Sequence, residues 1–141
     1  NFGIIGYIKF LYNKANWILS DGTFYFGYEG TWIVDGYQNQ NKIAKIVQKF
    51  ITVDSKAYKC ITANIMQMAW LIILLGLVLS YSKEKNEYLE IGKLAIIGII
   101  LFILLFEGRA RYLINYIPVF IFIGVYGLKN SLNKILTMKG K

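Results

Sequence analysis

The chain has 141 residues, of which 56% are apolar and only 17% are charged, and its mean hydropathy is +0.45. A soluble domain is usually about a quarter charged, so this composition indicates a protein that lives in lipid. The 16 Lys and Arg residues against 8 Asp and Glu residues give a net charge of +8. Because the lysines flank apolar runs, this excess predicts contact with anionic lipid head groups rather than with nucleic acid.

Cysteine and histidine are almost absent, with Cys60 as the single cysteine and no histidine. This excludes a disulfide within the chain, zinc sites built from Cys and His, and a Ser-His-Asp triad among these residues. We expect neither a bound metal nor a cofactor.

The first 60 residues divide into two regions. The sequence begins at Asn1 without a signal peptide, so we interpret residues 1–19 as the end of a preceding transmembrane helix and a re-entry segment, with the rest of the same polypeptide upstream. Residues 20–60 are expected outside the cytoplasm. The glycines that cluster in residues 21–36 favour a loop or short strands there rather than a helix.

An amphipathic helix is predicted near the end of this outer region. Its apolar positions follow the spacing i, i+3, i+4, i+7 and i+8, and they are Ile43, Ile46, Val47, Phe50 and Ile51. Its other face is basic and carries Lys42, Lys45 and Lys49. Such a helix can lie in the membrane interface, or it can pack on the extramembrane surface of the protein itself.

Residues 61–141 hold the predicted spans. Residues 61–81 form 21 positions without a charge, which cover about 30 Å as a helix, one hydrocarbon thickness. Residues 88–106 and 112–128 follow as two further spans, and Pro118 is expected to kink the last one. We therefore predict an all-α membrane protein with about three transmembrane helices, an extracytoplasmic loop region and an amphipathic interfacial helix.

Orientation follows from lysines in the short loops. Lys83, Lys85 and Lys93 flank the second span, and further lysines follow Leu128 to form a basic tail. Both segments, and hence the C-terminus, are predicted to be cytoplasmic. The hairpin before Tyr112 is then outside.

Aromatic residues and carboxylates alternate between Trp17 and Tyr37, with Asp21, Glu29 and Trp32 among them. Aromatic faces stack on the C–H side of a sugar, and carboxylates accept hydrogen bonds from its hydroxyl groups. The same residue types also form the aromatic belt of many membrane proteins, and from composition alone the belt is favoured.

A second group of functional candidates is the run Glu107-Gly108-Arg109-Ala110-Arg111-Tyr112. Arginine binds phosphate oxygens in a bidentate manner, and a helix N-terminus adds partial positive charge. These residues therefore suit the phosphate of a lipid-linked donor. A local Glu107–Arg111 pair with snorkelling anchors explains them equally well.

This run, with Leu113 after it, Pro118 further on and then Tyr126-Gly127-Leu128, resembles the last helices of GT-C class membrane glycosyltransferases, in particular bacterial relatives of protein O-mannosyltransferases. The run from Asp21 to Gly30 is similar to an extracytoplasmic loop motif of such proteins, and the resemblance covers about half of the chain. It implies a polyprenyl-phosphate sugar donor in a bacterial plasma membrane. It also implies a catalytic carboxylate in an upstream loop that this chain lacks.

The resemblance also implies roles for particular residues of the run before Leu113. Arg109 and Arg111 match the pattern and would neutralise the lipid phosphate, with Glu107 and Tyr112 beside them. The expected function is thus the C-terminal part of a glycosyltransferase. The alternative is a non-catalytic membrane subunit, flippase-like or a scaffold, of a cell-envelope polysaccharide assembly or export system.

Overall fold

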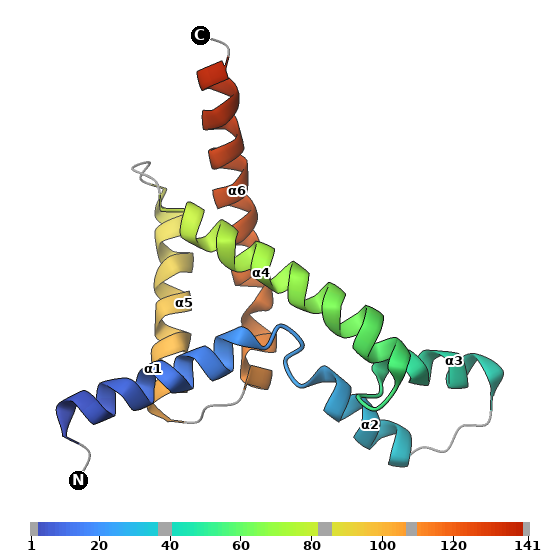
Figure 1. Ribbon diagram of the computed structural model, residues 1–141. Coiled ribbons are helices and arrows are strands. Elements are labelled where there is room, and N and C mark those ends of the chain that lie inside the picture. The colour runs from blue at the N-terminus through green and yellow to red at the C-terminus, as the bar shows by residue number, and fades with distance from the viewer. Residues whose placement is uncertain (1–2, 37–40, 82–85, 107–109, 140–141) are drawn as a thin grey trace.

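The structure is a computed structural model that describes residues 3–36, 41–81, 86–106 and 110–139, and throughout these ranges the chain forms helices joined by short turns (Figure 1). Two of the elements depart from α geometry, since η1 is a π-helical turn and η2 is a 3₁₀ helix. In chain order the elements are α1 (Ile4–Ser20), α2 (Phe26–Gly36), α3 (Lys42–Ile51), η1 (Tyr58–Thr62), α4 (Ala63–Leu79), α5 (Glu87–Leu105), η2 (Ala110–Tyr116) and α6 (Ile117–Lys139).

Three continuous helical stretches are long and apolar enough to cross a membrane. They are Tyr58–Leu79 with 22 residues, Glu87–Leu105 with 19, and Ala110–Met138 with 29. At about 1.5 Å per residue, each covers close to the hydrocarbon thickness of a bilayer or more. The predicted all-α fold class with three spans is confirmed.

The third span differs from the prediction at both of its ends. Pro118 lies in the first turn of α6, directly after η2, so the proline stands where the helix changes from 3₁₀ to α geometry. Proline has no N–H with which to continue the helical hydrogen bonds from η2, so it falls at this change of geometry. At the other end, the basic tail predicted after Leu128 is helical, since α6 runs on to Lys139 without a glycine or proline to end it before that residue.

Glycines bring α4 and α6 into close contact. A Cβ atom added at Gly76 would lie 2.2 Å from the carbonyl oxygen of Gly124, and one added at Gly127 would lie 2.0 Å from the carbonyl oxygen of Gly76. Small residues of this kind are typical of helix contacts in membranes, because they allow backbones to approach closely. Ser80 is buried at the same contact, and its hydroxyl donates to the carbonyl of Leu77 at 2.6 Å.

The core lies where α4, α5, η2 and α6 meet, and its largest fully buried side chains are Trp70, Phe120, Ile103, Leu113 and Ile123. Many other apolar side chains of the spans point outward, including Leu75 and Val78 of α4 and Ile97 of α5. Outward apolar side chains are expected where lipid is the solvent.

Residues 21–36 contain a helix, so the predicted loop or short strands are wrong. The glycines of α2 serve packing instead of breaking the helix. A Cβ atom at Gly27 would lie 2.4 Å from Tyr58 Cζ, and one at Gly30 would lie 2.1 Å from the carbonyl oxygen of Ile51. The backbone N–H of Gly27 also donates to the Tyr58 hydroxyl at 3.1 Å. These contacts hold α2 against α3 and against the start of the first span.

The predicted amphipathic helix is present as α3, and the side chain of Asn41 caps it by accepting from the N–H of Ile43 at 3.1 Å. None of its residues is buried, and Ile43 is 71% exposed. The apolar stripe is therefore not buried against the described extramembrane part of the protein. That α3 lies in the membrane interface stays a prediction.

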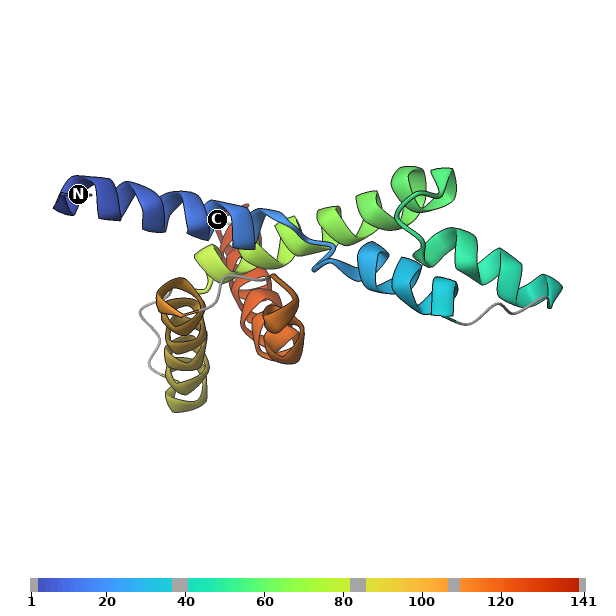
Figure 2. The same cartoon turned by 90° about the horizontal axis from the view of Figure 1, so that it is seen from below.

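Seen from below, α1, α2 and α3 follow one another in a row (Figure 2). In Figure 1 this row lies at the end of the molecule where α5 stops and η2 begins. Lys14 of α1 donates its ammonium to the carbonyl of Leu104 at 2.7 Å, which ties α1 to the C-terminus of α5. A cation is favourable at the negative end of a helix dipole. That residues 1–19 end a preceding span stays a prediction.

Candidate functional site

The turn between α1 and α2 is built around the carboxylate of Asp21. This carboxylate accepts from the N–H of Thr23 at 2.9 Å, from the Thr23 hydroxyl at 2.6 Å and from the N–H of Tyr25 at 3.3 Å. Phe24 and Tyr25 both have positive φ, at 50° and 64°, a conformation that costs about 1–3 kcal/mol for each non-glycine residue. Asp21, predicted to face a sugar, therefore holds a strained turn.

A polar side chain of α4 holds the same turn from the membrane side. Gln67 accepts from the N–H of Gly22 and donates to the carbonyl of Ser20, both at 2.8 Å. Trp70, one turn further along α4, donates its indole N–H to the carbonyl of Leu19 at 2.7 Å. Sequence reasoning missed Gln67. Its signal was an amide inside an apolar run, where polar groups need a partner.

Glu29 of α2 and Arg111 of η2 form an ion pair that joins the two groups of residues singled out in the sequence. Arg111 Nη1 donates to Glu29 Oε1 at 3.2 Å across 82 residues of chain, and the two side chains are 40% and 51% exposed, respectively. A pair this exposed is screened by water and contributes little to stability. It therefore orients the guanidinium more than it stabilises the fold.

Tyr112 completes this group of side chains. The guanidinium carbon of Arg111 lies 5.4 Å from the centroid of the Tyr112 ring, within the range of a cation–π contact. A guanidinium has five N–H donors, so contacts with Glu29 and Tyr112 leave capacity for an anion. Of the other predicted members, Glu107 and Arg109 lie outside the described residues, and so does the predicted local Glu107–Arg111 pair.

Aromatic rings between the end of α1 and the start of α2 contact one another in series. Tyr25 contacts Trp17 with ring centroids 6.1 Å apart and Tyr28 with centroids 5.7 Å apart. Trp32 lies on α2 three residues after Glu29 and is 78% exposed. The arrangement presents aromatic faces, a carboxylate and a guanidinium at one end of the molecule, a combination that suits a ligand with a flat apolar side and an anionic group.

We refer to Glu29, Arg111 and Tyr112, with the rings of Trp17, Tyr25 and Tyr28, as the outer cluster. Among the described residues, no three His, Cys, Asp or Glu side chains gather as metal ligands would. The chemistry that the outer cluster can supply is therefore anion binding by Arg111, hydrogen-bond acceptance by Glu29 and stacking by the aromatic rings.

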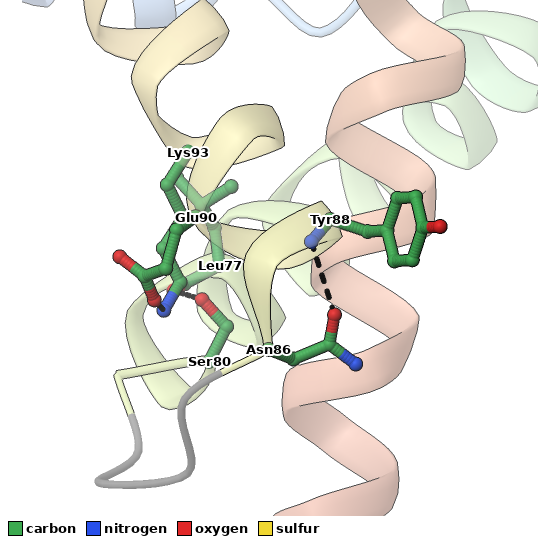
Figure 3. Close-up of polar contacts among 6 residues, drawn as sticks. All are labelled: Leu77, Ser80, Asn86, Tyr88, Glu90 and Lys93. Atoms are coloured by element: carbon green, nitrogen blue, oxygen red, sulfur yellow. Dashed lines mark hydrogen bonds and ion pairs between the residues drawn. The ribbon is translucent and has the colours of Figure 1, made fainter.

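A second described ion pair lies at the opposite end of the spans. Lys93 and Glu90 of α5 are 2.9 Å apart, one turn after the helix start, where Asn86 accepts from the N–H of Tyr88 at 3.1 Å (Figure 3). Lys93 also borders a cavity of about 170 Å³ between α4 and α5. An i, i+3 pair near a helix start is an ordinary interfacial anchor.

Comparison with known proteins places the chain in one family. Residues 1–132 match the family model CHIM_prot, described as conserved hypothetical integral membrane protein. No curated protein and no solved structure matches the chain. Because the match covers nearly the full length and the structure has three helices able to span a membrane, the chain belongs to this family of conserved hypothetical integral membrane proteins.

Proposed function

We propose that the chain is the C-terminal part of an integral membrane glycosyltransferase that moves a sugar from a polyprenyl-phosphate donor to an extracytoplasmic acceptor. The observation that carries the proposal is the ion pair between Glu29 and Arg111. These residues come from the two motifs on which the resemblance to GT-C enzymes rests, and they lie 82 residues apart in the chain.

In this proposal Arg111 binds the phosphate of the donor. Its charge stabilises the negative charge that develops on the phosphate as the sugar leaves, an effect that is large where water is excluded. Glu29 holds the guanidinium in place before the donor arrives, and the phosphate then shares or replaces that contact. Arg109, the other arginine of the motif, is proposed to act on the same phosphate.

The sugar is proposed to lie against the aromatic rings of the outer cluster. Trp17, Tyr25 and Tyr28 contact one another in series, and Glu29 follows Tyr28 directly on α2. The general base that deprotonates the acceptor hydroxyl comes from a carboxylate elsewhere in the complete protein. The chain described here supplies the donor side of the reaction.

The proposed location is the plasma membrane of a bacterium, with the outer cluster outside and the C-terminus in the cytoplasm. Lys93 lies in the N-terminal half of α5, and Lys129 and Lys134 lie in the C-terminal half of α6. These lysines support the orientation, because Figure 1 shows the start of α5 and the later part of α6 at the opposite end of the spans from the start of η2, which carries Arg111. Lysines in short segments beside spans favour the cytoplasmic side.

The test is a transfer assay in membranes from cells that produce the full-length protein. The donors are undecaprenyl phosphates that carry radiolabelled mannose, glucose or galactose. We expect Arg111→Ala to lower transfer by about 100-fold, the typical cost of losing one group that stabilises transition-state charge. Arg111→Lys should fall in between, because it keeps the charge and loses the planar fork.

Lys93→Ala is the matched control, because it breaks the other described ion pair, at the opposite end of the spans. Both variants should insert into the membrane like the unmodified protein, and Lys93→Ala should keep its transfer activity. Full activity of Arg111→Ala with the preferred donor, or no transfer from any donor by the complete protein, would overturn the proposal.

The non-catalytic alternative is favoured by a different observation. The far part of α6 exposes Leu132, Leu136 and Met138 beyond the last predicted span residue, and such an apolar helix face can dock a partner subunit. Co-purification of the full-length protein with a polysaccharide-assembly complex, together with no transfer activity, is the result that would select this alternative.

A further inference from the structure

A groove with apolar walls runs between α2 and α3. Its volume is about 430 Å³, and its walls are mainly Ile33 and Val34 from α2 and Ile43, Ala44, Val47 and Ile51 from α3. Two amide side chains, those of Asn41 and Gln48, complete the lining. In a polar surface region such a groove would leave its apolar walls in water, which is unfavourable.

The helix pair that forms the groove is firmly attached to the first span. Tyr58 is buried where the span begins, and its hydroxyl accepts from the N–H of Gly27. The N–H of Val53 donates to the carbonyl of Gly27 at 3.2 Å and to the hydroxyl of Thr31 at 3.1 Å. The groove is therefore fixed at the level where the chain enters the hydrocarbon region, and it cannot move far from lipid.

Charges on α3 identify the lipid class. Lys42, Lys45 and Lys49 recur at i, i+3 and i+7 on the face away from the apolar stripe, and all three are exposed. Lysine stems can lie along apolar surface while their ammonium groups reach phosphates at head-group depth. These lysines lie on the proposed outer side, where the charge bias of loops disfavours lysine, and contact with anionic head groups gives them a role there.

We propose that the groove between α2 and α3 binds an acyl chain of an anionic phospholipid, whose phosphate contacts the lysines of α3. The α2–α3 pair then lies in the outer leaflet, with the groove facing hydrocarbon and the lysine face turned toward head groups and water. Lipid binding in the groove is independent of the transferase proposal, because none of its residues belongs to the outer cluster, whereas the choice of leaflet rests on the orientation proposed above.

The experiment uses the full-length protein in nanodiscs of phosphatidylcholine, with or without phosphatidylglycerol. Spin labels are placed on Val47→Cys in the groove and on Lys45→Cys on the opposite face, in a Cys60→Ser background. Collisions with oxygen, which concentrates in the bilayer, are compared with collisions with a water-soluble nickel chelate. Ile97→Cys, on an outward position of α5, is the reference for contact with hydrocarbon.

With phosphatidylglycerol present, we expect oxygen to dominate at Val47→Cys, as it does at Ile97→Cys, and nickel to dominate at Lys45→Cys. Removal of phosphatidylglycerol, or the pair Lys42→Gln and Lys49→Gln, should raise nickel collisions at Val47→Cys several-fold. Equal access of nickel to Val47→Cys and Lys45→Cys in every nanodisc would overturn the proposal. So would a label at Val47→Cys that is immobile and shielded from both reagents, because a protein partner would then fill the groove.

Occupancy is checked by photolabelling. A phosphatidylglycerol with a diazirine in its acyl chain should label the α3 peptide more strongly than the matching phosphatidylcholine, and Val47→Ser should weaken that labelling. Equal labelling by both lipids would contradict the anionic preference. Arg111→Ala should leave the labelling unchanged, so failure of this inference and failure of the transferase proposal remain distinguishable.

Discussion

The contact between α4 and α6 gives the sharpest prediction about stability. Gly76→Ala adds a Cβ atom 2.2 Å from the carbonyl oxygen of Gly124, whereas ordinary contacts begin at 3.4 Å. The obstacle is backbone on both sides, so the two helices must separate along their crossing. Overpacking of this kind costs about 1–3 kcal/mol, while replacing glycine by alanine within a helix returns about 0.5–1 kcal/mol. We expect a net loss of about 1–2 kcal/mol.

Gly98→Ala is the matched control, because a Cβ atom at Gly98 of α5 meets nothing within 4 Å. Only the helix-propensity gain applies there, and the variant should be slightly more stable than the unmodified protein. The assay is SDS-induced unfolding of the full-length protein in mixed micelles, followed by tryptophan fluorescence, since Trp70 is buried beside Phe120 in the core. Equal midpoints for Gly76→Ala and Gly98→Ala would refute the reasoning.

Three further predictions concern the end of the molecule that carries the α1–α2 turn. Asp21→Ala should lower the free energy of unfolding by about 1–2 kcal/mol, because three donors of a strained turn lose their acceptor. Asp21→Asn keeps an acceptor oxygen and should recover part of the loss. Equal unfolding midpoints for the two variants would contradict this role of Asp21. Gln67→Leu should cost about 1–3 kcal/mol in the same assay, because an N–H and a carbonyl of the turn lose their partners, and an unchanged midpoint would mean that water or lipid replaces the amide. Glu29→Gln should remove the ion pair with Arg111 and leave the unfolding midpoint nearly unchanged, because the pair is exposed; a large drop in the midpoint would contradict this view of the contact.

The sequence was sufficient to predict the spans and α3, because the bilayer thickness sets the length of an apolar helix and a regular spacing marks a single helix face. It was not sufficient for α2. Gly27 and Gly30 suggest a loop when considered locally, and their actual role depends on Tyr58 and Ile51, which are distant in sequence. Local rules weigh glycine by propensity and cannot anticipate a close tertiary contact.

The candidate site shows the same limit. Residue types pointed to Glu29 and to Arg111 separately, but the ion pair between them depends on how the α1–α2 turn docks against α4. That docking depends on Gln67 and Trp70, whose hydrogen bonds end on backbone atoms of the turn. Backbone partners leave no trace in the sequence, so the pairing could be found only in three dimensions.

The glycine contact between α4 and α6 also has a mechanical consequence. Glu29 belongs to α2, which is fastened to the start of the α4 span through Tyr58, and Arg111 belongs to η2, which continues into α6. The two partners of the ion pair thus lie on separate arms that meet at one crossing (Figure 1). A small rotation of α4 relative to α6 at this glycine contact would therefore change the distance between the Glu29 carboxylate and the Arg111 guanidinium.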